Sequence, residues 1–198
     1  FSFKKIKMEI RNKSLILLDQ LILGFKKQTK LNKNKSKKLK ILCFGDSFTQ
    51  GCLGFTDSIC EPYGKTLSEL IENKLGLNKN EYRVDIKGID GECSSEMIYR
   101  LPGLLKKRKY NLVIILAGTN DIRTCKANKS VIESIIHLHN SVLNNTYNKK
   151  DASTVLITIP DMEMKQLGSK NFVKDRNEIN KSLIHYYNNK CVELSYNK

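Results

Sequence analysis

Apolar positions along the chain follow two spacings in turn, one typical of buried strands and one typical of amphipathic helices. Strands are expected at residues 39–45, 82–88, 111–117, 153–160 and 191–196, and helices at 62–75, 95–107, 130–143 and 171–187. The segment 111–117 is apolar almost throughout, which is typical of a strand covered on both faces, and 153–160 is interpreted as another buried strand. This alternation predicts an α/β fold, in which a parallel five-stranded sheet lies between helices on both of its faces.

The first 38 residues differ in charge from the rest of the chain. Residues 1–40 contain 13 Lys and Arg and only two acidic residues, a net charge of +11, whereas residues 41–198 contain 22 and 18, a net charge of +4. We therefore interpret residues 1–38 as a basic N-terminal arm or linker and residues 39–198 as the folded domain. The arm is interpreted as an unstructured tail, with an organellar targeting sequence or a membrane-surface helix as alternatives.

Composition excludes several classes of protein. No run of 18 apolar residues is present, so an ordinary transmembrane helix is not expected. The domain lacks a basic stripe with interleaved aromatic residues, so we expect no nucleic-acid partner. Six cysteines without a CxxC pair give no support for a zinc knuckle or a thioredoxin-type motif. Their scattered spacing favours a reducing, cytoplasmic compartment, with targeting to an organelle through the arm as the alternative.

The loops after the first three expected strands carry the residue types that acyl transfer needs. Ser47 follows Gly45 and Asp46 after the first strand, Gly91 lies in the loop after the second, and Asn120 lies in a Gly-Thr-Asn-Asp turn after the third. The carboxyl ends of parallel strands meet at one edge of a sheet, so these three residues are expected to lie close together. A serine nucleophile, a glycine N–H and an asparagine amide can attack a carbonyl and stabilise the oxyanion.

Other interpretations of the first loop fit less well. A phosphate-binding P-loop needs Lys after its second glycine, but Cys52 follows Gly51. An α/β-hydrolase nucleophile elbow needs glycine where the chain has Thr49. A flavodoxin-like phosphate site stays open, although it leaves Gly91 and Asn120 without a role. The structural alternative for Ser47 is a helix-capping serine.

With these three loops, the chain resembles the SGNH (GDSL-type) hydrolases, which act on esters and thioesters. Gly45-Asp46-Ser47 is similar to the first block of that family, Gly91 to the glycine of the second block, and Asn120 to the asparagine of the third. The resemblance implies that Ser47 is the nucleophile, and that the backbone N–H groups of Ser47 and Gly91 and the Asn120 side chain form the oxyanion hole. It also implies a three-layer, flavodoxin-like α/β/α sheet from residue 39 to the end of the chain.

The chain departs from the family pattern at two places. Phe48 stands where the family name has leucine, which changes packing rather than chemistry. The family takes its base from a late Asp-x-x-His block, and none of the three histidines, His137, His139 and His185, has Asp three residues before it. We expect all three on helix surfaces or at helix boundaries. We interpret the domain as truncated before its final loop and helix.

The resulting functional hypothesis is a serine hydrolase that cleaves carboxylic ester or thioester bonds through an acyl-enzyme. It implies a small-molecule ester or lipid-like substrate and neither a metal nor an organic cofactor, because the oxyanion hole polarises the carbonyl. Without the Asp-x-x-His block, residues 1–198 alone are expected to be inactive. Two alternatives stay open: an acyltransferase on the same fold, and a non-catalytic binding module without the base.

Overall fold

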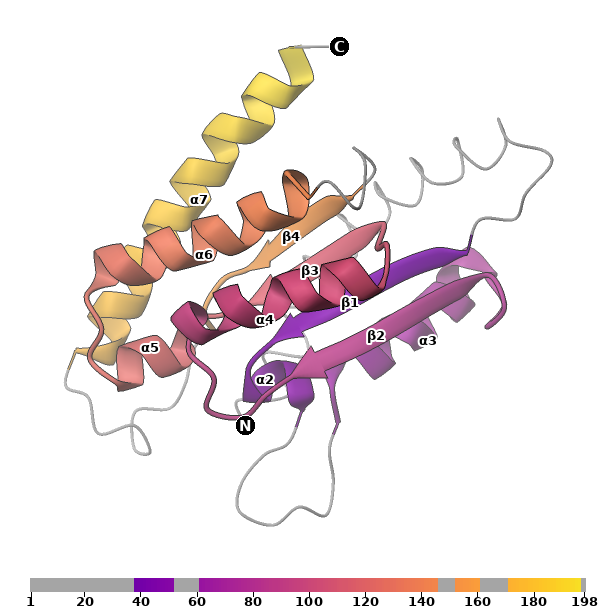
Figure 1. The fold of residues 1–198 in the computed structure, drawn as a ribbon, viewed down its shortest axis with the longest axis horizontal. Coiled ribbons are helices and arrows are strands. Elements are labelled where there is room, and N and C mark those ends of the chain that lie inside the picture. Colours follow the sequence, from indigo (N-terminus) through magenta and orange to yellow (C-terminus); the bar gives the residue numbers. More distant parts are fainter. Residues whose placement is uncertain (1–37, 52–60, 146–151, 161–170, 197–198) are drawn as a thin grey trace.

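The computed structural model describes residues 38–51, 61–145, 152–160 and 171–196, with side chains in the last segment as far as Tyr187. Its elements (Figure 1) are β1 (Leu39–Gly45), α2 (Ser47–Gln50), α3 (Tyr63–Leu75), β2 (Tyr82–Gly88), α4 (Ser94–Lys107), β3 (Leu112–Leu116), α5 (Thr119–Arg123), α6 (Asn128–Leu143), β4 (Ser153–Ile157) and α7 (Phe172–Tyr196). The four strands are parallel and lie in the order β2-β1-β3-β4. The predicted α/β class and parallel sheet are confirmed.

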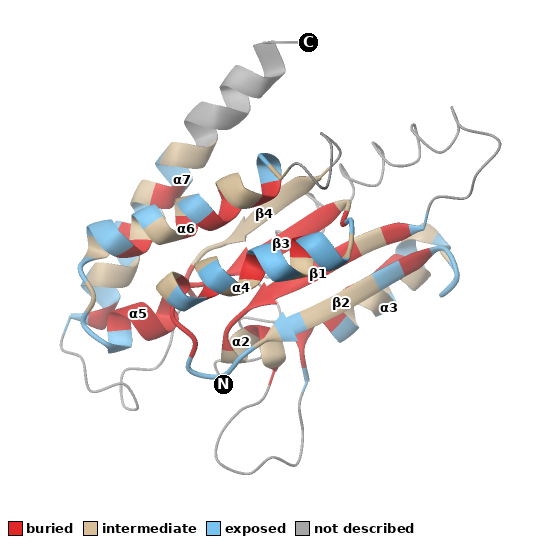
Figure 2. Ribbon diagram, in the orientation of Figure 1, coloured by how far each residue is buried: buried red, intermediate tan, exposed pale blue. Residues whose placement is uncertain are grey.

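Two apolar cores, one on each face of the sheet, hold the helices in place. On β1, Leu42 and Phe44 belong to the core beneath α4 and α6, whereas Ile41 and Cys43 belong to the core beneath α3. Successive side chains of a strand point to opposite faces, so one apolar run supplies both cores. Figure 2 shows that buried residues dominate β1 and β3, while exposed residues line the outer faces of α4 and α6. The helices therefore form two layers around the sheet.

The register brings the carboxyl ends of the central strands to one level. Gly45 at the end of β1 pairs with Gly88 of β2 and with Leu116 of β3, and Leu116 pairs with Ile157 of β4. The strand order reverses between β1 and β3, and ligands of open α/β sheets bind at such a switch point. The loops that carry Ser47 and Asn120 leave the two strands that flank it.

The fifth strand predicted at residues 191–196 is wrong. These residues form the end of α7, and the part of the sheet that the structure describes has four strands. Residues 171–196 contain neither glycine nor proline, so only Asn188 and Asn189, a weaker helix-stop signal, separate the expected helix from the expected strand. A short apolar run fits a helix as well as a strand, and here the helical interpretation prevails.

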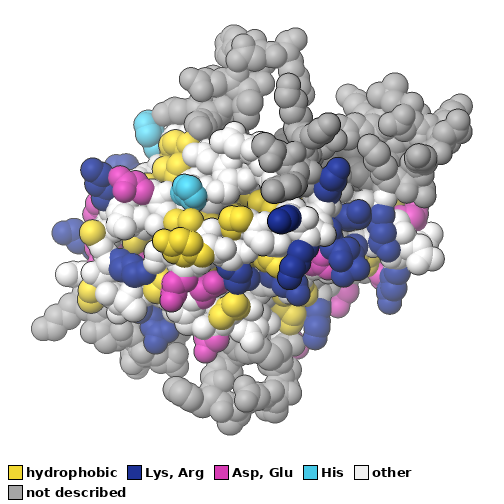
Figure 3. Space-filling model, viewed as in Figure 1, with side chains coloured by type: hydrophobic (Ala, Val, Ile, Leu, Met, Phe, Trp, Pro, Cys, Tyr) yellow, Lys and Arg dark blue, Asp and Glu magenta, His cyan; other side chains and the backbone are white. Residues whose placement is uncertain are grey.

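Basic side chains gather at the end of the domain opposite the loops that carry Ser47, Gly91 and Asn120. Figure 3 shows Lys and Arg over the carboxyl-terminal half of α4 and the neighbouring strand β2. Lys106, Lys107 and Lys109 are exposed there. Because α4 runs from the end of β2 to the start of β3, these charges lie near the amino ends of the strands. Within the described residues, no helix is both long enough and apolar enough to cross a membrane.

Candidate active site

Ser47 is the first residue of α2, a single helical turn directly after β1. The N-cap is Asp46, whose carboxylate oxygen Oδ1 accepts a hydrogen bond from the Phe48 backbone N–H at 3.0 Å. The turn ends at Gly51, whose φ of 78° lies in the left-handed region that favours glycine. Asp46, not Ser47, is therefore the capping residue, which removes the structural alternative for Ser47. The first N–H groups of a helix have no partner within it, and among the described residues no other acceptor binds the Ser47 N–H, so it can donate to a ligand.

Two glycines let α2 lie directly against the sheet. A Cβ atom at Gly88 would lie 2.6 Å from the Asp46 carbonyl oxygen, and a Cβ at Gly45 would clash with the Thr49 side chain and the Leu116 carbonyl. These separations are shorter than atoms tolerate, so only glycine fits at either position. The short helix that carries Ser47 is thus seated on the ends of β1 and β2.

Gly91 lies on an exposed turn between β2 and α4. Its φ is 73°, and a Cβ there would meet nothing within 4 Å, so backbone conformation rather than space favours glycine. The turn is tied to β1 because the Ile89 N–H donates to the Gly45 carbonyl at 3.1 Å. The structure therefore brings the Gly91 turn and the Ser47 helix to the same side of the sheet. We call this side the rim: it is formed by the loops that follow the carboxyl ends of β1, β2 and β3.

The Asn120 side chain is held at both of its polar ends. Its Nδ2 donates to the Glu92 carbonyl oxygen at 3.0 Å, and its Oδ1 accepts from an Arg123 guanidinium nitrogen at 3.3 Å. The residue is 5% exposed. Because the amide carries two N–H groups, one remains to donate elsewhere. The hydrogen bond to Glu92 joins the loop after β3 to the residue that follows Gly91.

Sequence reasoning missed the contacts that support Asn120. The buried Asp121 carboxylate accepts hydrogen bonds from the Ser94 N–H at 2.8 Å and the Ser94 hydroxyl at 2.9 Å, and Lys126 Nζ lies 3.5 Å from its Oδ1. Asp121 thereby fixes the start of α4 to α5. An aspartate next to Asn120 and a serine at the start of a helix were the available signals.

Buried carboxylates concentrate negative charge beneath the rim. Asp46 is fully buried, and burial raises its pKa to about 7, with further upward contributions from the charges of Asp121 and Glu92. Glu92 is paired with Arg100. A partly protonated Asp46 lowers the negative charge beside Ser47, where an oxyanion would have to be stabilised.

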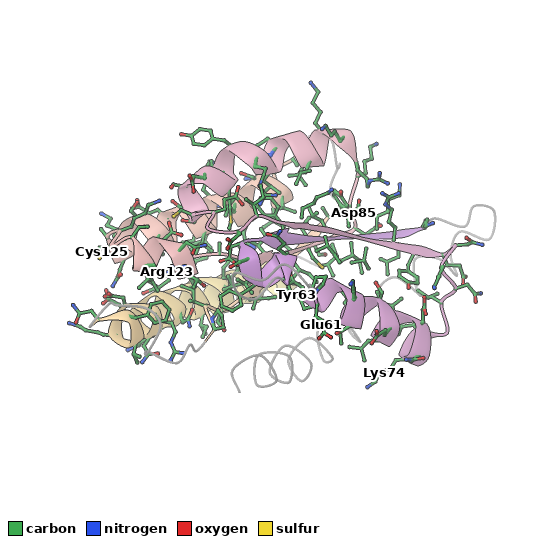
Figure 4. The ribbon with its side chains drawn as sticks, turned by 90° about the horizontal axis from the view of Figure 1, so that it is seen from below. Glu61, Tyr63, Lys74, Asp85, Arg123 and Cys125 are labelled. Atoms are coloured by element: carbon green, nitrogen blue, oxygen red, sulfur yellow. The ribbon has the colours of Figure 1, made fainter. Side chains whose placement is uncertain are left out.

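Other buried groups near α2 are not available as nucleophiles. Tyr63, the first residue of α3, and Cys43, in the core beneath α3, are both buried, and burial raises the pKa of the Cys43 thiol to about 12. Figure 4 labels Tyr63 at the end of α3 nearest α2, with Lys74 at the opposite end of that helix. The thiolate, not the thiol, is the reactive form of cysteine, so Cys43 acts as a small apolar residue.

The histidines lie in two different environments. His137 and His185 are exposed on α6 and α7, as expected. The expectation is wrong for His139, which is 1% exposed: its Nδ1 lies 2.7 Å from the Thr154 hydroxyl and its ring packs edge-on against Tyr187. Its position on the apolar face of α6, one residue after the buried Leu138, turns it into the core. Within the described residues, no hydrogen bond joins a histidine to Ser47.

Comparison with a protein-family model shows which family has this arrangement of loops. The GDSL-like lipase/acylhydrolase family model matches residues 43–194. The chain belongs to this family. The match covers all three loops of the rim, from Cys43 in β1 to Leu194 in α7. No curated protein matches the chain significantly.

Solved structures of esterases are similar to this GDSL-like protein in fold. They include Est24, a carbohydrate acetylesterase from Sinorhizobium meliloti (21% identity, TM-score 0.60), and the aryl esterase of M. smegmatis (19%, 0.59), each covering 76% of this chain and 81% of its own. TesA is similar as well, at 20% identity and a TM-score of 0.56, over 74% of this chain and 73% of its own. Similarity at this identity shows the shared fold. Membership of the lipase/acylhydrolase family rests on the family model.

Proposed function

We propose that this GDSL-like protein is a serine ester hydrolase in which Ser47 is the nucleophile and the N–H groups of Ser47 and Gly91, with the Asn120 amide, form the oxyanion hole. The observation that carries the proposal is the clamped Asn120 amide, which is bonded to the residue after Gly91 on the rim that also holds Ser47. Donors fixed before the reaction stabilise a developing oxyanion without a cost of reorganisation.

Each residue has one task in the proposed reaction. The Ser47 oxygen attacks the ester carbonyl, its proton passes to a base, and the alcohol leaves with a proton from that base. Water then attacks the acyl-serine and releases the acid. The family pattern supplies the base from an Asp-x-x-His block that residues 1–198 do not contain. The chain alone is therefore proposed to be a slow catalyst, since a serine hydroxyl without a base is a weak nucleophile.

The proposed substrates are small esters or thioesters. Est24 is a carbohydrate acetylesterase and the M. smegmatis neighbour is an aryl esterase. Short acyl esters, with an aryl acetate as the activated member, are accordingly the first substrates to test.

Chemical rescue tests the proposal on this chain. Purified residues 1–198 are assayed with an aryl acetate and increasing imidazole, which supplies a base in solution. We expect a saturable rate that rises with imidazole and that Ser47→Ala loses. Ser141→Ala is the matched control, because Ser141 lies near the carboxyl end of α6, where its hydroxyl donates to the His137 carbonyl of the same helix. A saturable rate that survives in Ser47→Ala would refute the assignment of the nucleophile.

A further inference from the structure

The guanidinium of Arg100 on α4 joins the ends of β1 and β2 to the Gly91 turn. Its Nε donates to Glu92 Oε1 at 2.7 Å, and one terminal nitrogen donates to Glu92 Oε2. That same nitrogen donates to the Gly45 carbonyl at 3.2 Å, and the other donates to the Lys87 carbonyl, also at 3.2 Å. The group lies 4.2 Å above the Phe44 ring, which adds a cation–π contact. One planar side chain thus binds three segments of the rim.

Glu92 is bound at both its side chain and its backbone. The carboxylate faces Arg100, and the backbone carbonyl accepts from the Asn120 amide at 3.0 Å. The Glu92 side chain is 8% exposed and that of Arg100 is 21% exposed, so most of this ion pair is shielded from water. Buried ion pairs add little net stability, because desolvation offsets their attraction. The pair is therefore better explained by the geometry that it enforces than by the stability that it adds.

We infer that Arg100 is a positioning residue that acts through Glu92 to hold Gly91 and Asn120 in place to bind the oxyanion. This inference rests on the function proposed above. The Gly91 turn is exposed and has few other anchors, so its orientation depends on the residue next to it. When the guanidinium is lost, Glu92 keeps its bond to Asn120 but loses its fixed direction. A misplacement of about 1 Å costs on the order of 10²-fold in rate.

The test compares two variants of the Arg100–Glu92 ion pair with one variant of the more exposed Arg83–Asp85 ion pair. Arg100→Lys keeps the charge but cannot form the planar fork, and Glu92→Gln keeps the shape but removes the charge. The control is Arg83→Lys, because Arg83 pairs with Asp85 at 2.7 Å near the start of β2 and is 48% exposed. If Arg100→Lys fails to fold, Glu92→Gln carries the same comparison.

Hydrogen–deuterium exchange on the full chain reads the position of the turn without relying on activity. We expect exchange in residues 88–94 to rise at least tenfold in Arg100→Lys and Glu92→Gln. Exchange in α3 is expected to stay at the native rate, and Arg83→Lys should leave both segments unchanged. Native exchange of residues 88–94 in both variants overturns the inference.

The rate measurement separates a positioning role from a merely structural one. On the Ser47-dependent, imidazole-rescued rate we expect kcat to fall 10- to 100-fold with KM within about twofold, because the lost interaction acts in the transition state. An unchanged kcat together with faster exchange overturns the inference while the proposed function stands. If the native chain shows no Ser47-dependent rate, the proposed function fails, and the exchange data alone decide whether Arg100 positions the turn.

Discussion

Asp121 accepts two hydrogen bonds from Ser94, one from the backbone N–H at 2.8 Å and one from the hydroxyl at 2.9 Å. The two residues are 27 positions apart, and both are buried. This contact links the start of α4 to α5, so the loops after β2 and β3 depend on each other. We therefore expect the loss of this contact to destabilise the rim.

Asp121→Ala should lower the free energy of unfolding by about 2–4 kcal/mol, because it leaves two buried donors unpaired. Urea unfolding followed by circular dichroism measures the change. Glu69→Ala, on the exposed side of α3, is the control and should stay within about 0.5 kcal/mol of the native chain. A loss of the same small size for Asp121→Ala would contradict the role given to this contact.

Two buried groups make stability depend on pH in opposite directions. Burial raises the pKa of Asp46 from 3.8 to about 7, so its contribution to stability is present below about pH 4 and is lost as the pH rises to 7. Burial lowers the pKa of His139 from 6.5 to about 3, so its contribution is present above about pH 6.5 and is lost as the pH falls. Between about pH 4 and pH 6.5 the two effects largely cancel.

Asp46→Asn removes one side of this balance. Its free energy of unfolding, compared with that of the native chain, should then rise with pH by roughly 1 kcal/mol per unit between about pH 4 and pH 6.5, because His139 alone remains. Urea titrations at four or five pH values measure the slope. A slope that does not differ from the native one would show that Asp46 titrates normally.

His139→Leu removes the other side and should reverse the sign. Relative to the native chain, its stability should fall as the pH rises from about 4 to 7, because the buried Asp46 must then lose its proton. The variant also leaves the Thr154 hydroxyl without its His139 partner, which lowers stability by an amount that does not depend on pH. The pH slope, not the overall loss, is the decisive measurement.

Gly88→Ala should displace the helix that carries Ser47, since the new Cβ would meet the Asp46 carbonyl. We expect a loss of about 1–3 kcal/mol in stability and a lower Ser47-dependent rate. Gly103→Ala is the control, because it makes the same substitution inside α4 at a position where a Cβ would meet nothing within 4 Å. That variant should be stabilised by about 0.5–1 kcal/mol. Equal behaviour of the two variants, measured by thermal unfolding and rate, would contradict the seating of α2.

Most of the fold could be predicted from the spacing of apolar residues. The strands at 39–45 and 82–88 were predicted with their observed bounds, because each runs between clear turn signals. The helix at 62–75 begins one residue later than predicted. The prediction for 191–196 failed because Asn188 and Asn189, which are a weak helix-stop signal, lie inside α7. The short helix α5 was missed because one turn is too brief to show a helical period.

The candidate site could be predicted only in its main residues. The positions of Ser47, Gly91 and Asn120 after their strands follow from a parallel sheet, because strand ends meet at one edge. The contacts of Arg100 and Asp121 could not be predicted, since they join residues far apart in the chain through side-chain geometry. His139 was misplaced because a polar residue on an apolar helix face can be buried once a partner such as Thr154 is present.

The common level at which β1, β2 and β3 end has a consequence for changes in chain length. Ser47, Gly91 and Asn120 lie two, three and four residues beyond Gly45, Gly88 and Leu116, which are paired at the ends of their strands. The position of each of the three residues therefore depends on where its strand ends relative to the other two. Deleting one residue inside a strand would retract its loop by about 3.3 Å and turn its side chains to the opposite face. Insertions at the opposite edge of the sheet, such as in the turn before Tyr82, leave this count unchanged. The domain should therefore tolerate insertions and deletions in the turns before the amino ends of its strands, but not within β1, β2 or β3.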